Sequence, residues 1–421
     1  MPFNRSLEDD WFLLPHELRL QKAHARTLHA AGVLTAEECS ALESALDILR
    51  KNHTGQTSPE SDAEDLHTWV EALLVEAIGE AGRKIHTARS RNDQVATLLV
   101  MYAIDAGERL VKRLGELIRT ACERATAWSE LIVPLHTHSQ FAAPGSAGFW
   151  MLRYAAAFDR ARESVRSSVG QWRRYCPLGS GAVAGSTIAI DRSIQARELG
   201  FDGPSRNALE SISARDECLQ WLALAAQVGL QLQSLAADVI MFAQTPLGWT
   251  VYPGSFGTGS SMMPNKTNPD AMELLRGECC AIAAAHGQAV LLLKGLPSGY
   301  NRDLQCIKPL LHGTAEKLLE LCEMTNVFLS ELDFDRERIA QALRLGAIDA
   351  TARMEQKVRG GMPLRDAHHA IAVEVANAPQ REVSVSDAEA IAAAYQTFGN
   401  ASPTETRRIA GELLQQLETA S

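Results

Sequence analysis

The chain has few features of an exported, membrane-spanning or metal-bound protein. It contains no run of about eighteen apolar residues, and its N-terminus has neither a basic segment nor an apolar one, so export and membrane spanning are both disfavoured. Its eight cysteines are scattered, and no Cys-x-x-Cys pair or Cys/His cluster has the spacing of a zinc site. We therefore expect a cytoplasmic protein with reduced, buried cysteines.

Positive charge is also in deficit. Lys and Arg number 41 against 51 Asp and Glu, which gives a net charge of -10. A surface of this sign disfavours nucleic acid or an anionic membrane as the main partner, although a local basic patch stays open. Neither nucleic acid nor a membrane is therefore expected as a partner.

Strand-like alternation is almost absent, and helical periodicity takes its place. The short β-branched piece at residues 186–190 is too isolated to form a sheet of any size. Apolar residues recur instead at three- and four-residue steps over residues 93–121, 215–242 and 269–293. The last of these helices is expected to begin at Pro269. The sequence therefore predicts an all-α protein.

The chain length and the positions of the long helices predict three parts. With 421 residues and 46% hydrophobic content, the chain can bury a large core. Long helices usually bundle with one another, so we expect a central bundle at residues 91–337 that carries the catalytic loop. It would lie between an N-terminal helical domain at residues 1–90 and a small C-terminal helical domain at residues 338–421.

The most informative segment is the loop at residues 257–270, Gly-Thr-Gly-Ser-Ser-Met-Met-Pro-Asn-Lys-Thr-Asn-Pro-Asp. On composition alone, an ordinary Gly/Ser surface loop is the commoner explanation. Its hydroxyl, ammonium and carboxamide groups nevertheless suit removal of a proton beside a carboxylate, because the resulting anion needs positive charge and hydrogen-bond donors. Ser260 or Ser261 is the candidate base, and Lys266 and Asn268 are the candidate anion ligands.

Two further clusters place polar side chains near expected helix starts. His67 follows Glu64 and Asp65 in an acidic segment, where a surface histidine is the commoner explanation. Residues 89–94, Arg-Ser-Arg-Asn-Asp-Gln, come at the start of the first long helix, where backbone N–H groups and arginines favour a dicarboxylate. A capping segment with solvated arginines explains them about as well.

Polar groups also mark two breaks between helices. His136 and His138 stand two residues apart without a third ligand nearby, so an acid/base histidine oriented by a carboxylate such as Glu273 fits better than a metal site. Residues 295–308 gather side chains that could orient the remote part of a substrate, although a solvated helix start explains them nearly as well. These side chains are Tyr300, Arg302, Gln305 and Lys308.

The loop also carries a family resemblance. Residues 259–269 closely resemble the signature Gly-Ser-Ser-x-x-Met-Pro-x-Lys-x-Asn-Pro of the fumarase/aspartase superfamily, with one spacer residue less. Enzymes of that superfamily reversibly eliminate an amine or a hydroxyl group from a substituted succinate and release fumarate. The resemblance implies that Ser260 is the base and that Lys266 and Asn268 hold the aci-carboxylate.

Within this superfamily, nearly the whole chain resembles the argininosuccinate lyases, which split argininosuccinate into arginine and fumarate in arginine biosynthesis. The strings at residues 89–94 and 268–270 are the discriminating matches. The resemblance implies a homotetramer with active sites shared between subunits, a small-molecule substrate, and no metal or organic cofactor.

The resemblance also assigns the substrate contacts. The residues implied to hold the succinyl carboxylates are Ser90, Arg91, Asn92 and Thr137, with His67 nearby. His138, paired with Glu273, would help to protonate the leaving group or tune the charge of the site. The residues implied to face the arginine half are Ser6, Asp10, Tyr300, Gln305 and Lys308.

Several positions depart from the family pattern. Ala88 stands where Gly is usual, Ala214 replaces the first Asp of an Asp-Arg-Asp string, and Cys306-Ile307 replaces an acidic pair. Arg5 and Ser139 are further departures. Since lost carboxylates bear on recognition of the guanidinium half, a lyase acting on another N-substituted aspartate is the alternative. A catalytically quiet, crystallin-like relative is a second alternative.

Overall fold

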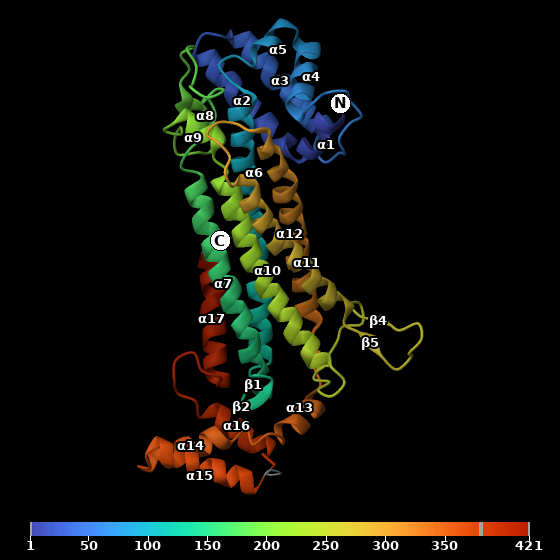
Figure 1. Ribbon diagram of the computed structural model, residues 1–421, viewed down its shortest axis with the longest axis vertical. Helices are drawn as coiled ribbons and strands as arrows, with labels where there is room; N and C mark the ends of the chain where they lie inside the picture. Colours follow the sequence, from blue (N-terminus) through green and yellow to red (C-terminus); the bar gives the residue numbers. More distant parts are fainter. Residues whose placement is uncertain (1, 379–381, 420–421) are drawn as a thin grey trace. The chain divides into compact units, whose positions relative to one another are not determined.

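The computed structural model describes residues 2–378 and 382–419, and most of them are helical, which confirms the all-α class (Figure 1). The α-helices are α1 (Leu7–Asp10), α2 (Leu14–Ala30), α3 (Ala36–His53), α4 (Leu66–Ile78), α5 (Glu80–Lys84), α6 (Arg91–Ala127), α7 (Ala147–Trp172), α8 (Arg192–Leu199), α9 (Ala208–Ser213), α10 (Asp216–Ala243), α11 (Asp270–Leu293), α12 (Ile307–Glu331), α13 (Arg336–Leu343), α14 (Ala350–Arg359), α15 (Leu364–Asn377), α16 (Val385–Ala393) and α17 (Pro403–Thr419). The 3₁₀ helices are η1 (Pro2–Asn4), η2 (Trp11–Leu13) and η3 (Arg302–Cys306).

The chain divides into two compact units, each assembled from three segments. The first unit consists of Met1–Val111, Ser164–Ala226 and Ile282–Leu318. The second consists of Lys112–Glu163, Gln227–Ala281 and Leu319–Ser421. The domain boundaries at residues 90 and 337 stay a prediction.

The three long helices predicted from the periodicity, α6, α10 and α11, form where it places them. In α6, the apolar residues at three- and four-residue steps are buried, among them Leu98, Leu110, Leu114, Leu117 and Ala121. The side chain of Asp93 accepts the backbone N–H of Ser90 at 2.9 Å and so caps the start of this helix. Helix α11 begins at Asp270, one residue later than predicted, because Pro269 lies at the N-cap and its carbonyl accepts the N–H of Glu273.

Helix α10 is apolar for most of its length. Within the described residues it is the one helix that is long and apolar enough to cross a membrane, judged by length and composition. Core helices of soluble proteins pass the same test, so this finding is weak evidence for a membrane span. The residues of α10 that are buried in the core include Cys218, Leu222, Val228, Leu235 and Val239.

In the part of the chain that the structure describes, three short two-stranded sheets accompany the helices. Strand β1 (Ile132–Thr137) pairs antiparallel with β2 (Gln140–Ser146), and β3 (Thr250–Val251) pairs with β6 (Asp333–Phe334). Strand β4 (Thr258–Gly259) pairs with β5 (Thr267–Asn268). Period-2 alternation does not reveal β1, because its first three residues are all buried.

All eight cysteines are free thiols. Six of them are buried, as expected, whereas Cys280 and Cys306 are exposed. The expectation of uniformly buried cysteines is therefore wrong at these two positions, each of which lies on the outer side of its helical turn.

Candidate active site

The predicted catalytic loop is the β4–β5 hairpin, drawn as a yellow arm in Figure 1. Its strands pair Thr258 with Asn268, and the Thr258 hydroxyl donates to the carboxylate of Asp270 at the start of α11. Gly257 leaves no room for a side chain, since a Cβ there would lie 2.7 Å from Cγ2 of Thr267. The base of the hairpin is therefore fixed to the helix that follows it.

Ser260 lies at the start of the hairpin tip. Its Oγ accepts the backbone N–H of Met263 at 2.9 Å and that of Met262 at 3.3 Å. Donors of this kind favour the alkoxide over the hydroxyl, because they stabilise negative charge on the oxygen. Ser260 is half-buried, whereas Ser261 is exposed. Of the two candidate bases, Ser260 therefore has the surroundings that better stabilise an alkoxide.

The two candidate anion ligands lie on the other side of the hairpin. Lys266 is exposed and makes no ion pair with any described residue, so its ammonium is free to meet an incoming anion. Asn268 is half-buried on β5. Met262, at the tip between Ser260 and Lys266, has 88% of its surface exposed. The tip thus offers reactive groups that the protein itself does not neutralise.

His138 lies in the tight turn between β1 and β2. Thr137 pairs with Gln140 across this turn, and the two central residues have positive φ, 52° at His138 and 59° at Ser139. Two-residue hairpin turns need this left-handed backbone, which costs a residue with a Cβ some strain. Thr137 and His138 are both exposed, so the turn presents two predicted site residues together.

The predicted pairing of His138 with Glu273 is not made within the described part of one chain. No hydrogen bond or ion pair joins His138 to Glu273 in the described structure, and Glu273 is exposed in the first turn of α11. His136 is half-buried on β1, where its ring lies edge-on to Phe242 at 5.9 Å. Within residues 2–378 and 382–419, no three His, Cys, Asp or Glu side chains are grouped to hold a metal ion.

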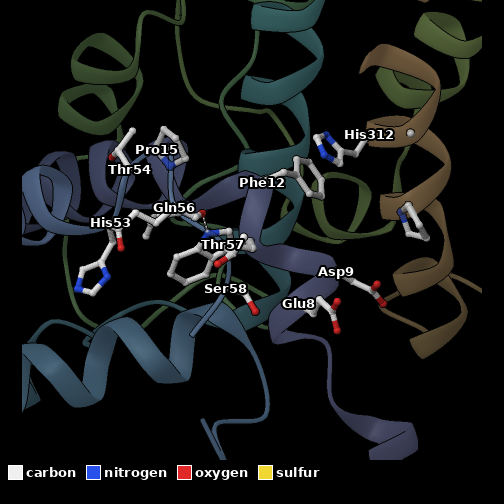
Figure 2. Close-up of a pocket in the computed structure, with 15 residues that line it drawn as sticks. Glu8, Asp9, Phe12, Pro15, His53, Thr54, Gln56, Thr57, Ser58 and His312 are labelled. Carbon is white, nitrogen blue, oxygen red and sulfur yellow. Dashed lines mark hydrogen bonds between the residues drawn. The ribbon is translucent and has the colours of Figure 1, made fainter. Parts of the chain in front are cut away.

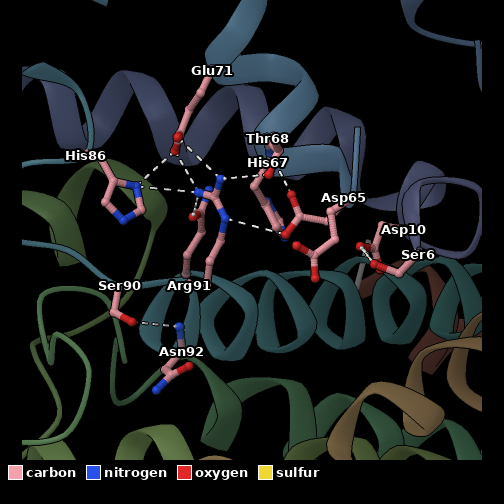
Figure 3. Close-up of polar contacts among 12 residues, drawn as sticks. Ser6, Asp10, Asp65, His67, Thr68, Glu71, His86, Ser90, Arg91 and Asn92 are labelled. Carbon is pink, nitrogen blue, oxygen red and sulfur yellow. Dashed lines mark hydrogen bonds and ion pairs between the residues drawn. The ribbon is translucent and has the colours of Figure 1, made fainter. Parts of the chain in front are cut away.

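The segment at residues 89–94, where α6 begins, is held by carboxylates of the first unit (Figure 3). Nη1 of Arg91 donates to Glu71 at 2.6 Å, and its Nε lies 3.5 Å from Asp65. Arg89 is buried and contacts Glu71 at 3.3 Å. Burial opposes ionisation of Glu71, but hydrogen bonds from His86 and Arg91 outweigh it and hold the carboxyl pKa well below its usual value. The arginines are thus paired within the protein, so the reading of this segment as solvated arginines is wrong.

Ser90 and Asn92 complete this segment. The Ser90 Oγ accepts the backbone N–H of Asn92 at 3.2 Å, as Figure 3 shows. The carboxamide of Asn92 donates to the carbonyl of Ala182 at 2.9 Å. Asp93 is fully buried and accepts two further backbone N–H groups, so this corner is tightly ordered. Their role as succinyl ligands stays a prediction.

His67 is buried, with 1% of its surface exposed, so the surface-histidine interpretation is wrong. It lies in the first turn of α4, which Asp65 caps by accepting the N–H of Thr68 at 2.6 Å. Its Nδ1 lies 3.1 Å from Oε2 of Glu17, a carboxylate of α2 that is itself fully buried. The acidic residue that contacts the ring of His67 is therefore far away in sequence and was not predicted.

The predicted contacts of the amine half converge on one buried carboxylate. Oδ1 of Asp10 accepts from the ammonium of Lys308 at 2.5 Å and from the carboxamide of Gln305 at 3.2 Å. Oδ2 accepts from the hydroxyl of Ser6 at 2.7 Å. Burial lowers the pKa of Lys308, and the charge of Asp10 opposes this shift. The structure therefore brings together four of the five residues predicted to face the amine half.

Tyr300 and the unpredicted Arg215 lie in the electrostatic surroundings of this cluster. Burial raises the pKa of Tyr300, and Arg215 opposes the shift. Arg215 is 3% exposed, and its Nη1 donates to the carbonyl oxygens of Ala214 and Ile212. Its Nε and Nη2 have no partner in the described residues. A buried guanidinium with unused donors next to Ala214 is what loss of a neighbouring carboxylate would leave.

A separate cavity of about 620 Å³ in the first unit contains none of the predicted site residues (Figure 2). The ring of His312 stacks on Phe12 at 4.3 Å, and the exposed carboxylates of Glu8 and Asp9 lie at the same cavity. No Lys or Arg is among its lining residues. A dicarboxylate would find no positive charge there, so this cavity does not fit the predicted substrate.

The chain has one sequence signal for the missed Glu17. Glu17, Gln21 and His24 are spaced by four and three residues in α2, and all three are buried. A polar stripe at helical spacing on a buried face is typical of an internal hydrogen-bond network. Glu71 carries no comparable signal, since its partners His86, Arg89 and Arg91 lie outside its helix. No pattern in the sequence marks the burial of Arg215.

Comparison with known proteins identifies the family. A family model described as "Lyase" matches residues 2–284. The argininosuccinate lyase of Koribacter versatilis is 36% identical over 388 residues, which cover 92% of this chain and 83% of the relative. That of Legionella pneumophila is also 36% identical, over 91% of this chain and 94% of the relative. The chain belongs to this lyase family, within the fumarase/aspartase superfamily. It is thus a lyase that acts on a small molecule.

Solved structures of other proteins share the fold of the lyase. An EDDS lyase variant with bound fumarate has a TM-score of 0.83 at 20% identity and covers 97% of this chain and 86% of its own. The class II fumarase of Schistosoma mansoni has a TM-score of 0.72 at 18% identity, over 93% and 90% of the two chains. These likenesses confirm the fumarase/aspartase-like fold of the lyase.

Proposed function

We propose that the lyase is an argininosuccinate lyase, which cleaves argininosuccinate reversibly into arginine and fumarate. The environment of Ser260 carries the proposal for the reaction, because its Oγ accepts two backbone N–H groups in a loop that also holds a free ammonium. The argininosuccinate lyases at 36% identity support the choice of substrate.

The proposed reaction is an anti-elimination. The Ser260 alkoxide takes the proton from Cβ of the succinyl group, and the electron pair moves into the adjacent carboxylate as an aci-carboxylate. Lys266 and Asn268 stabilise this anion with charge and a hydrogen bond. The pair then returns to form the C=C bond of fumarate, while the C–N bond breaks and its electrons leave on nitrogen, which gains a proton.

The remaining predicted residues would hold the two ends of the substrate. Ser90, Arg91, Asn92 and Thr137 would bind the succinyl carboxylates, with His67 close by. His138 and Glu273 would assist proton transfer to the leaving nitrogen. Ser6, Asp10, Tyr300, Gln305 and Lys308 would hold the amine half.

A direct assay tests the substrate and the base together. Purified protein with argininosuccinate should release fumarate, followed by its ultraviolet absorbance, and Ser260→Ala should reduce kcat by at least about 10³-fold with an unchanged melting temperature. Ser261→Ala is the matched control and should retain activity. A Ser260→Ala rate equal to that of the natural chain would contradict the assignment of the base.

A second candidate function is cleavage of another N-substituted aspartate. Both oxygens of Asp10 are already occupied by Ser6, Gln305 and Lys308, and Arg215 keeps unused donors beside Ala214. These residues leave no free carboxylate for a guanidinium, which favours an amine half that does not depend on a cation. A panel of succinyl-amines assayed for fumarate release distinguishes the two candidates. No release from any of them would favour the catalytically quiet alternative.

We also propose that the lyase is a homotetramer whose active sites combine residues of several subunits. Large apolar side chains stay exposed on three of its long helices, namely Leu230, Leu274, Leu291 and Val327. Contiguous exposed apolar surface is typical of interfaces between subunits, and these side chains are the ones that an interface along the long helices would cover. Light scattering should give a mass of about four times the 45.8 kDa chain, and a monomer would contradict the proposal.

A further inference from the structure

The buried pair of Glu17 and His67 lies beside the segment predicted to bind the succinyl group. Nδ1 of His67 is 3.1 Å from Oε2 of Glu17, but the two atoms are not aligned as a hydrogen bond. Nε2 of His67 also has no hydrogen-bond partner in the described part of the chain. Buried polar atoms are normally satisfied, so an imidazole with two open nitrogens suits a task that a bound molecule completes.

The other carboxylate oxygen of Glu17 reaches the segment at residues 89–94, where α6 begins. Oε1 accepts the carboxamide N–H of Gln94 at 2.6 Å and that of Gln21 at 2.6 Å. Oε1 of Gln21 in turn accepts from Arg89 at 3.0 Å. A single carboxylate therefore connects His67 to the segment that carries Ser90, Arg91 and Asn92.

Glu17 is ionised despite its complete burial. Burial opposes ionisation, but the adjacent His67, the charge of Arg89 and the hydrogen bond from Gln94 outweigh it and lower the pKa of the Glu17 carboxyl. A buried carboxylate accepts strongly from an N–H group in a medium of low dielectric constant. It thus favours the form of His67 in which Nδ1 carries a proton, and leaves Nε2 for the substrate.

We propose that Glu17 is a positioning residue. It fixes the proton on Nδ1 of His67 and holds that ring in a constant orientation relative to the segment at residues 89–94. This inference rests on the proposed function, because it assigns Glu17 to the succinyl end of that same site. Glu17 touches no substrate. Its effect on turnover passes through His67.

A double-mutant cycle tests whether Glu17 acts through His67. Glu17→Gln keeps the shape of the side chain but removes its charge, and should lower kcat/KM for fumarate release about 100-fold, as a small misplacement of a site residue does. His67→Asn should have a similar effect, and the double variant should be no worse than His67→Asn alone. Additive losses, or normal turnover in Glu17→Gln, would overturn the proposal.

A matched control tests whether the loss of a histidine–carboxylate pair outside the predicted site also lowers turnover. Asp105 pairs with the buried His16 at 2.7 Å in the same unit, and neither residue is in the predicted site. Asp105→Asn should keep kcat/KM within about twofold of the natural chain. If Glu17→Gln fails to fold, Glu17→Asp replaces it in the cycle, since it keeps the charge but withdraws the carboxylate from the ring.

Ring-nitrogen NMR gives a readout that does not depend on turnover. In full-length protein labelled with ¹⁵N-histidine, the signals of His67 are identified by their loss in His67→Asn. They should show a protonated Nδ1 in the natural chain and not in Glu17→Gln; an unchanged pattern would overturn the proposal. If the protein releases fumarate from no succinyl-amine, the proposed function fails, and this measurement still decides the role of Glu17.

Discussion

The Asp10 cluster and the tip of the β4–β5 hairpin differ in whether the protein itself pairs their charged and polar groups. Around Asp10, charges are buried and each oxygen of the carboxylate has a partner from the protein. At the hairpin tip, Lys266 is exposed without an ion pair among the described residues, and the Ser260 oxygen has only backbone donors. Binding groups can be fixed in advance, whereas groups that meet charge as it develops need to stay unneutralised until then.

The largest effect is expected from a substitution of Asp10, which tests whether its buried charge is structural. Asp10→Ala leaves the Lys308 ammonium buried and unpaired, so the free energy of unfolding should fall by about 3–5 kcal/mol. Denaturant unfolding followed by circular dichroism measures the change. The neighbouring Asp9 is exposed, and Asp9→Ala should change stability by less than about 0.5 kcal/mol. Equal effects of the two substitutions would mean that Asp10 is not a structural charge.

The opposite result is expected at the hairpin tip. Lys266→Met should lower kcat about 10²- to 10³-fold, because it removes a charge aimed at the developing anion, and should leave the melting temperature unchanged. Lys294→Met, at an exposed lysine that follows α11, is the control and should be normal in both respects. A large loss of stability in Lys266→Met would show that the tip is packed rather than open.

The stability of the first unit should depend on pH through Glu71. The pKa of Glu71 is lowered in the folded protein, so its contribution to stability is fully present above its ordinary value of 4.5 and is lost as the pH falls below that value. The natural chain should therefore lose stability faster than Glu71→Gln below about pH 4.5. Unfolding midpoints across this pH range measure the difference, and parallel curves would contradict the assignment.

The smallest effect is expected at Ala88, before the arginine segment. Its φ of 58° is left-handed, a conformation that costs a residue with a Cβ about 1–2 kcal/mol. Ala88→Gly should therefore stabilise the protein, by about 0.5–1 kcal/mol after the entropy of the unfolded chain is subtracted. Ala77→Gly, at an exposed position of α4, should instead destabilise by about 1 kcal/mol. Thermal unfolding compares the two.

The sequence predicts α6, α10 and α11 well, because their apolar period extends over many turns. It does not delimit α7 and α12, which are of similar length. It does not predict the β1–β2 hairpin, since Ile132, Val133 and Pro134 are all buried and no alternation marks the strand. Strands of two residues, such as β4 and β5, are too short to leave any pattern.

The candidate site follows the same rule. The motifs that carry Ser260, Lys266 and Asn268 are contiguous, so the sequence reveals them. The state of His67 depends on Glu17, fifty residues earlier in the chain, and that of Arg91 depends on Glu71 in another helix. Contacts between separate elements decide burial and charge, and a single sequence carries little trace of them.

The left-handed turn at His138 has a consequence for mutagenesis. Because φ is 52° there, an alanine at this position would change the hairpin as well as remove the imidazole, and a loss of activity would have two causes. Asparagine accepts this backbone readily. His138→Asn is thus the substitution that reports on the imidazole alone, and the difference between the two variants measures how much the turn itself contributes.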